Sequence, residues 1–420
     1  MRCKVYDCDG YKIHAIKTDK YRTSTINVCF RKELKKEDIS SYTILARLLT
    51  HSCKKYSSRR EMSIELERLY SSVIYASSNI EGNTLNFDVT YDFLNPKYCE
   101  KGYLDEVIEF LFEVINHPNA RDGKFLEDPY NICINLFKSM IEEEKEYVNS
   151  YSLRRSLECM DSKSPISYSS LGYLEDLDKI DPSTLYKSYK KLFTDFKIDI
   201  YVSGNIDMDL VIDYIKKYFI IKNSMNSYGN IYASVSTRKE VNEVVEYGDY
   251  EQASFIMLYN MIDLTKREKE VVLPIFNSIF GSNELTSKLY SNVREKNSLC
   301  YNISSYFMKL NGVLVVKAGI DQKNKEKCIK LVDKCLKEMV NGKFSDEDVL
   351  CAKKTRINQV KMREDSTWAL INIQIGIDLT NEISGNRLIN EFKTVTKKEV
   401  VNLAKKIKLN TIYMLCKEGN

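Results

Sequence analysis

The stretch GSNELTSKLYSNVREKNSLCY, residues 281–301, contains more polar and charged side chains than folding alone requires. Its apolar residues recur at helical spacing, at Leu285, Leu289 and Val293. This periodicity predicts a short helix over residues 288–296. A serine and an asparagine before the helix are typical of a turn that also caps it.

Two side chains at the end of this stretch are candidates for function. Arg294 stands at the end of the predicted helix, and Tyr301 opens a strand predicted over residues 301–306. A polar turn joins that strand to a β-branched strand at residues 312–320. A guanidinium and a phenolic hydroxyl are both hydrogen-bond donors that can hold a carbonyl or carboxylate in one cleft. The alternative is structural, with Arg294 paired to a nearby glutamate and Tyr301 filling the edge of a core.

Composition excludes several classes of function. The chain has 420 residues, 63 basic and 59 acidic side chains and a net charge of +4, with no long block of like charge. Nucleic-acid binding is therefore not expected. No apolar run is long enough to cross a bilayer or to form a signal peptide, so we expect a cytoplasmic protein without membrane contact.

The cysteines and histidines argue against a metal or another cofactor. The 12 cysteines show no CxxC pair, and the chain has only 3 histidines, which are far apart in sequence. The cysteines are therefore expected to be reduced thiols, many of them buried. No cofactor is predicted. New chemistry would need a nucleophile with a base, and the sequence offers no Cys-His or Ser-His pairing for it.

A repeated tripeptide divides the chain. Gly-Lys-Phe occurs at residues 123–125 and again at 342–344, each time after an amphipathic helix and before another helix. The same tripeptide at the same step of the same order of elements indicates a duplicated unit. We therefore predict one half over residues 1–221, a linker over 222–239, and a second half over 240–420.

Each half is predicted to be α+β. In the first half, apolar residues between 104 and 116 fall on one helix face, and Glu81-Gly82-Asn83 predicts a hairpin. Strands at residues 198–203 and 411–415 close the two halves. The predicted fold is two tandem halves, each a mostly antiparallel sheet covered by helices, which together form a clamshell with a site in its cleft.

This order of elements resembles the pitrilysin/insulinase-type metallopeptidases, the family that includes mitochondrial processing peptidase. The resemblance covers nearly the whole chain and is strongest in SKLxxxVREK at residues 287–296. LERLY at 66–70, the segment 87–96 and MREDS at 362–366 resemble the zinc-less YmfF-type branch in bacteria.

The zinc motif of the family is lost. Family members carry HxxEH on a helix that precedes a turn, and the turn here is SCKKY at residues 52–56. Counting back from it, the motif positions hold Thr43, Ala46 and Arg47 in place of histidine, glutamate and histidine. Threonine and arginine are not zinc ligands, so no bound metal and no independent peptidase activity are expected. The family's third ligand, a glutamate, would fall between residues 131 and 144.

The second half departs less from the family. The resemblance implies that Arg294 and Tyr301 bind the substrate peptide in the cleft. It also implies a heterodimer in which this non-catalytic chain serves a zinc-bearing metallopeptidase homologue. The alternative is a stand-alone peptide-binding or scaffold protein that has kept the cleft without chemistry.

Overall fold

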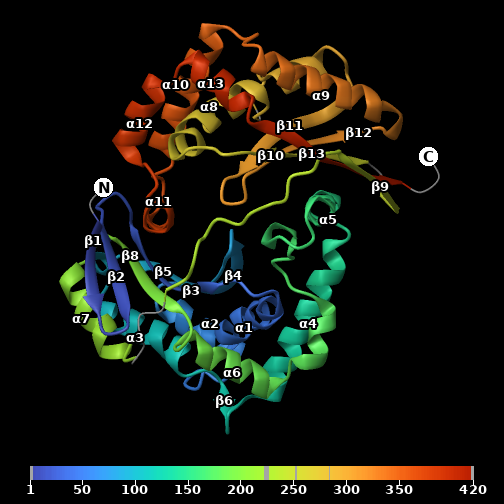
Figure 1. Ribbon diagram of the computed structural model, residues 1–420. Coiled ribbons are helices and arrows are strands. Elements are labelled where there is room, and N and C mark those ends of the chain that lie inside the picture. Colours follow the sequence, from blue (N-terminus) through green and yellow to red (C-terminus); the bar gives the residue numbers. More distant parts are fainter. Residues whose placement is uncertain (1–2, 222–226, 251–252, 283, 418–420) are drawn as a thin grey trace. The chain divides into compact units, whose positions relative to one another are not determined.

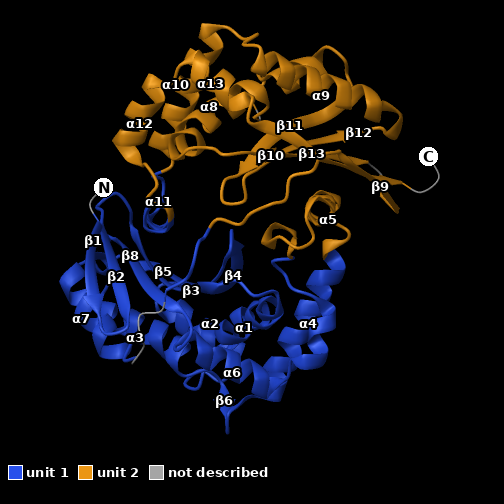
Figure 2. Cartoon of the chain, viewed as in Figure 1, with its two compact units in different colours: residues 1–143, 169–231, 364–379 blue, residues 144–168, 232–363, 380–420 orange. Residues whose placement is uncertain are grey.

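The structure, a computed structural model, describes residues 1–420 apart from 1–2, 222–226, 251–252, 283 and 418–420. The chain forms two compact units, each assembled from three segments (Figure 2). Unit 1 contains Met1–Glu143, Ser169–Ile231 and Glu364–Leu379, and unit 2 contains Glu144–Tyr168, Tyr232–Arg363 and Thr380–Asn420.

Unit 1 is built on a six-stranded sheet in the order β1-β2-β8-β3-β5-β4. Its strands are β1 (Cys3–Cys8), β2 (Tyr11–Lys17), β3 (Thr23–Glu33), β4 (Val73–Glu81), β5 (Thr84–Leu94) and β8 (Lys197–Gly204). Neighbouring strands are antiparallel except β2 and β8, which are parallel. β4 is an edge strand, and among the described strands only β5 is hydrogen-bonded to it.

Unit 2 is built on a five-stranded sheet in the order β11-β12-β10-β13-β9. Its strands are β9 (Asn242–Gly248), β10 (Ser254–Met261), β11 (Cys300–Met308), β12 (Val313–Ile320) and β13 (Ile407–Lys417). Again one pair, β13 with β9, is parallel and the others are antiparallel. β11 is an edge strand.

The two sheets share one topology. If β1 is set aside, the order β2-β8-β3-β5-β4 in unit 1 matches β9-β13-β10-β12-β11 in unit 2, including the position of the parallel pair. In both units the closing strand lies between that parallel partner and the long strand that begins the antiparallel run. The predicted fold class, two tandem α+β halves with mostly antiparallel sheets, is confirmed.

Helices cover these sheets (Figure 1). Unit 1 has α1 (Ile39–His51), α2 (Arg59–Arg68), α3 (Tyr103–Asn116), α4 (Glu127–Glu144), α6 (Pro182–Leu192), α7 (Met208–Tyr218) and α11 (Thr367–Thr380). Unit 2 has α5 (Val148–Met160), α8 (Leu273–Phe280), α9 (Lys325–Val340), α10 (Asp346–Met362), α12 (Gly385–Thr394), α13 (Lys397–Ala404) and two π-helical segments, η5 (Glu268–Val272) and η6 (Tyr290–Glu295).

Short elements complete the chain. The 3₁₀ turns are η1 (Lys36–Asp38), η2 (Pro96–Tyr98), η3 (Pro165–Ser167), η4 (Leu174–Lys179) and η7 (Gln322–Asn324), and β6 (Ala120–Arg121) pairs with β7 (Lys124–Phe125). Local chemistry sets several helix starts. At α6, the carboxylate of Asp181 accepts hydrogen bonds from the backbone of Ser183 and Thr184, and Pro182 occupies the first turn.

The repeated tripeptides occupy corresponding places. Gly123 and Gly342 both adopt positive φ, +75° and +67°, which glycine tolerates without strain. Phe125 lies against α6 and Phe344 lies against Lys397 of α13, and both phenylalanines are buried. Because α6 and α13 each precede the closing strand of their sheet, the two turns anchor equivalent helices.

Each unit includes one helical segment that comes from the other half of the sequence. The residues that follow α4, with α5, belong to unit 2, whereas the residues that follow α10, with α11, belong to unit 1 (Figure 2). The predicted division at residues 222–239 was drawn from the duplication alone and did not include this exchange. Residues 222–226 of the predicted linker lie outside the described part, and its other residues have no regular structure.

α11 is held on the unit 1 sheet by buried polar contacts. His14 on β2 places Nε2 2.9 Å from Asp199 Oδ1 on β8 and Nδ1 3.1 Å from Asp378 Oδ2 on α11. Thr25 and Thr367 share a hydrogen bond of 2.6 Å. Trp368, the single tryptophan of the chain, packs beside the same contacts in a small apolar cluster. This surface docks a helix that the sequence places in the other half.

α5 is held in unit 2 in a comparable way. Its Leu157 and Met160 pack against β10 and β13 in an apolar cluster, and Ser152 shares a 2.8 Å hydrogen bond with Ser254. Arg155 forms an ion pair of 2.6 Å with Glu246 on β9.

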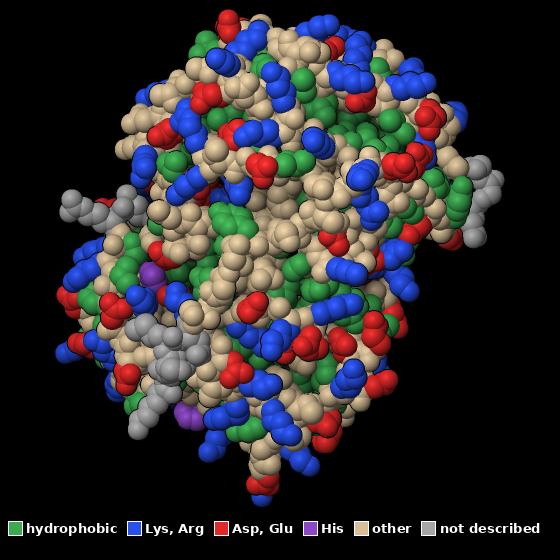
Figure 3. Space-filling model, viewed as in Figure 1, with side chains coloured by type: hydrophobic (Ala, Val, Ile, Leu, Met, Phe, Trp, Pro, Cys, Tyr) green, Lys and Arg blue, Asp and Glu red, His purple; other side chains and the backbone are tan. Residues whose placement is uncertain are grey.

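The surface shows no segregation of charge on the face that Figure 3 draws, where Lys and Arg alternate with Asp and Glu. In the part of the chain that the structure describes, no helix is long and apolar enough to span a membrane.

All the cysteines are free thiols, and those buried are Cys29, Cys53, Cys133, Cys328, Cys335 and Cys416.

Candidate functional site

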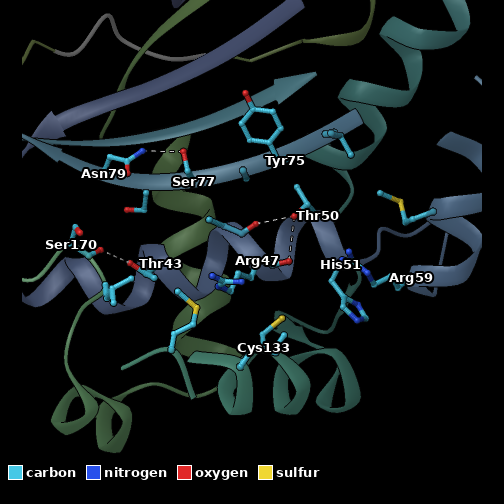
Figure 4. A pocket seen from close by; sticks show the side chains of 18 of the residues that line it. Thr43, Arg47, Thr50, His51, Arg59, Tyr75, Ser77, Asn79, Cys133 and Ser170 are labelled. Carbon is cyan, nitrogen blue, oxygen red and sulfur yellow. Dashed lines mark hydrogen bonds between the residues drawn. The ribbon is translucent and has the colours of Figure 1, made fainter. Parts of the chain in front are cut away.

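A pocket of about 480 Å³ opens in unit 1 at the predicted zinc-motif positions. It is lined by α1, α2, α4, β4 and residues 170–171. Thr43, Ala46 and Arg47 all line it from α1. Figure 4 shows Thr43, Arg47 and His51 following one another along this helix, with Cys133 of α4 below them. The motif positions deduced by counting back from the SCKKY turn are therefore brought to one concave surface.

The side chains at these positions either form other contacts or are chemically unsuited to metal binding. Thr43 Oγ1 donates a hydrogen bond of 3.3 Å to the carbonyl of Ser170, and Ala46 is buried against the helix's neighbours. Arg47 is exposed to the pocket. Its cationic guanidinium would repel a metal ion that family members hold with histidine at this position.

The rest of the lining does not supply a metal site either. α4 presents Cys133, Leu136 and Met140, so no glutamate of this helix takes the place of the family's third ligand. Among the described residues, no cluster of three or more His, Cys, Asp or Glu side chains could hold a metal ion. Zinc therefore does not fit this pocket.

Purified protein is expected to contain no stoichiometric zinc, because Thr43 and Arg47 stand where two imidazoles are required. Inductively coupled plasma mass spectrometry after dialysis against metal-free buffer measures this directly. A zinc-bearing member of the family, measured in the same way, is the positive control. One tightly held zinc per wild-type chain would contradict the expectation.

The electrostatics of the pocket favour an anion rather than a metal cation. Its lining includes Arg47 and Arg59 and no aspartate or glutamate, and neither arginine has an ion pair among the described residues. Burial lowers the pKa of His51, and the charge of Arg59 lowers it further. Burial raises the pKa of Cys133 to about 11 against the charges of Arg47 and Arg59. His51 and Cys133 are therefore neutral at neutral pH. Arg59 was not among the site residues predicted from the sequence.

The wall of the pocket includes an edge strand. Residues 74–79 of β4 line it, and in the described part of the chain β4 pairs with β5 alone. Figure 4 shows Tyr75, Ser77 and Asn79 on the face of β4 turned away from α1, so Ile74, Ala76 and Ser78 alternate toward α1. A free strand edge beside a pocket is a typical docking place for an extended peptide.

Arg294 and Tyr301 lie in unit 2, on elements that contact each other. Arg294 falls within the π-helical segment η6 rather than past its end, and its guanidinium lies 4.7 Å from the Tyr290 ring centroid. Tyr301 is 85% exposed on the edge strand β11, at an irregularity between Cys300 and Ile303. π-Helical turns and β-bulges both occur often at functional sites, because they redirect side chains.

The structural alternative for these two residues is wrong. Arg294 forms no ion pair with any described residue, and Tyr301 does not fill a core. Neither lines the pocket in unit 1. Their convergence on one cleft and their contact with substrate stay predictions.

Comparison with known proteins gives a consistent result. Residues 179–356 match the model of the peptidase M16 inactive domain. The chain is 26% identical over 412 residues to the probable inactive metalloprotease YmfF of Bacillus subtilis, covering 97% of this chain and 96% of that protein. It is 23% identical over 344 residues to the non-peptidase homolog YmxG of Helicobacter pylori, covering 78% and 74%.

A solved structure of a conserved protein from Enterococcus faecalis has the same fold, with a TM-score of 0.92 and 24% identity over 100% of this chain and 99% of that one. The family match, the two relatives named as inactive or non-peptidase and the pocket that does not fit zinc agree with one another. The chain is thus similar over nearly its whole length to a probable inactive metalloprotease, and residues 179–356 match the inactive domain of the M16 peptidases.

Proposed function

We propose that this chain is the non-catalytic subunit of a heteromeric peptidase, in which Arg294 and Tyr301 bind the peptide cleaved by a zinc-bearing homologue. The observation that carries the proposal is the contrast between the two units. The zinc positions of unit 1 hold Thr43, Ala46 and Arg47, whereas Arg294 and Tyr301 remain exposed, with no ion pair among the described residues to occupy the guanidinium.

The local geometry suits a peptide ligand. β11 is an edge strand, so its free backbone groups can pair with an extended peptide, as in strand addition. Arg294 lies close enough to this edge that its charge opposes the rise in the pKa of the Cys300 thiol, which burial causes. A guanidinium and a phenol at the start of such a strand can donate hydrogen bonds to backbone carbonyls of the bound chain.

The chemistry requires a second subunit. A carbonyl attacked by water develops negative charge, and donors aimed at it stabilise the transition state even when they belong to another chain. In the complex the homologue supplies the zinc and this chain supplies the donors. The cytoplasmic location expected from the sequence stays a prediction.

Reconstitution tests the proposal. The tagged chain is mixed with the HxxEH-bearing homologue from the same genome, and a quenched fluorescent peptide library is used to follow cleavage. A stable heterodimer that cleaves peptides faster than the homologue alone is the expected result. The stand-alone binding or scaffold alternative predicts peptide binding with no acceleration by any homologue. A homologue that neither binds this chain nor responds to it would contradict the proposal.

A further inference from the structure

The pocket of unit 1 lacks the ligands of a cation site and is lined by the cationic side chains of an anion site. Two guanidinium groups, Arg47 from α1 and Arg59 from the first turn of α2, line it without a single carboxylate. Both arginines line the same pocket as Cys133. An anion placed between them would relieve the mutual repulsion of two like charges.

A second observation points to a missing ligand. The Ser78 hydroxyl, on the α1-facing side of β4, is buried and has no hydrogen-bond partner among the described residues. A buried hydroxyl without a partner is unfavourable, and such groups usually find one in the functional state. The neighbouring hydroxyls of Thr43 and Thr50 are already used, as they donate to the carbonyls of Ser170 and Ala46.

The free edge of β4 determines what kind of molecule carries the anion. A peptide that extends β4 by one strand would continue past the pocket in both directions, so a side chain rather than a chain end would enter it. Arginine holds a carboxylate with two parallel hydrogen bonds, a geometry that lysine cannot provide.

We infer that this pocket binds the carboxylate side chain of an acidic residue in a peptide that pairs with the edge of β4. The inference deepens the proposed function and rests on its premise that the chain binds peptides. Arg47 and Arg59 hold the carboxylate. The positions where relatives hold zinc thus select substrates by charge.

Selection from a random heptapeptide library tests the inference on the full-length chain alone. The heptapeptides are embedded in a display protein, so that only side-chain carboxylates are available. Wild-type protein is expected to enrich aspartate or glutamate at one position. The Arg47→Glu, Arg59→Glu double variant should instead enrich lysine or arginine there. For a selected peptide, replacing the acidic residue by its amide should weaken binding roughly tenfold to a hundredfold.

The controls keep the outcomes distinct. Arg60→Glu makes a single charge reversal beside Arg59 but outside the pocket and should leave the selection unchanged, and each single pocket reversal is compared with it. All three arginines are exposed, so folding should be retained. The His51 ring, followed by NMR, should titrate at higher pH when a selected acidic peptide is bound, because an added anion opposes the effect of Arg59.

Selected peptides without an acidic position, or the same peptides for wild type and double variant, would overturn the inference and leave the proposed function standing. A second library with free carboxyl termini is included. Enrichment in that library alone would mean that the pocket binds the carboxylate of a chain end, and it would overturn the assignment to an acidic side chain. Capture of no peptide in any arm would overturn the inference and also the peptide-binding premise of the proposed function.

Discussion

Arg294→Ala is expected to slow peptide cleavage by the reconstituted complex by roughly tenfold to a thousandfold, the range for one lost oxyanion donor. Tyr301→Phe removes a single hydroxyl and is expected to have an effect at the lower end of that range. Both losses arise because the donors stabilise charge that develops only in the transition state. Steady-state kinetics should therefore show the loss in kcat as well as in kcat/KM.

These two substitutions should leave the fold intact. Both side chains are exposed, and replacing an exposed side chain usually changes the free energy of unfolding by under about half a kcal/mol. Matched controls are Lys296→Ala, which removes a nearby exposed cation, and Tyr306→Phe, which removes a hydroxyl from the same strand. Full activity with both Arg294 and Tyr301 replaced would refute the shared site.

His14→Leu is expected to lower the free energy of unfolding of unit 1 by about 3 to 5 kcal/mol, the cost of breaking a buried charged pair from one side. The imidazole is 6% exposed and lies between Asp199 and Asp378. Lys197 remains 2.8 Å from Asp199 in the variant, which places the cost toward the lower end. Denaturant titration followed by fluorescence of Trp368, on the docked helix α11, measures the change.

The pH dependence of the free energy of unfolding should show that the charge of His14 causes the stabilisation. Burial acts to lower the pKa of His14, but the hydrogen bond to Asp199 and the ion pair with Asp378 outweigh it and raise the pKa from 6.5 to about 11. The stabilisation is thus complete below pH 6.5 and is lost as the pH rises through about 11. The stability difference between wild type and His14→Leu should shrink over that interval.

Two further variants serve as controls. Asp378→Asn should cost less than His14→Leu, because the pair with Asp199 remains. Lys12→Ala, which breaks an exposed pair on the same strand, should cost under about 1 kcal/mol. Equal stability of His14→Leu and wild type at pH 7 would show that the buried pair contributes nothing.

Elements with strong local patterns could be predicted from the sequence. The apolar face of α3 and the hairpins of β4 with β5 and of β11 with β12 follow from periodicity and turn residues close in the chain. β9 was missed, because its sequence NEVVEYG is polar and its parallel partner, β13, lies at the other end of the second half. Glu246 is accommodated in β9 by Arg155, which comes from the exchanged helix α5.

The exchange itself could not be predicted. An amphipathic helix shows in its sequence that it covers a sheet but not which of two similar sheets it covers. The candidate site, too, could be predicted only in part. Counting from a family turn located Thr43, Ala46 and Arg47, whereas Arg59 reaches their pocket from a separate helix, α2.

The reciprocal placement of α5 and α11 makes this single chain equivalent in connectivity to a domain-swapped dimer whose protomers have been fused. Each sheet completes its covering with a helix encoded in the other half of the gene. Cutting the gene in the linker would therefore yield two fragments that each lack one packing partner and expose another. Unfolding of one unit withdraws a helix from the other, so the two units should be coupled in stability although their sheets repeat one strand order.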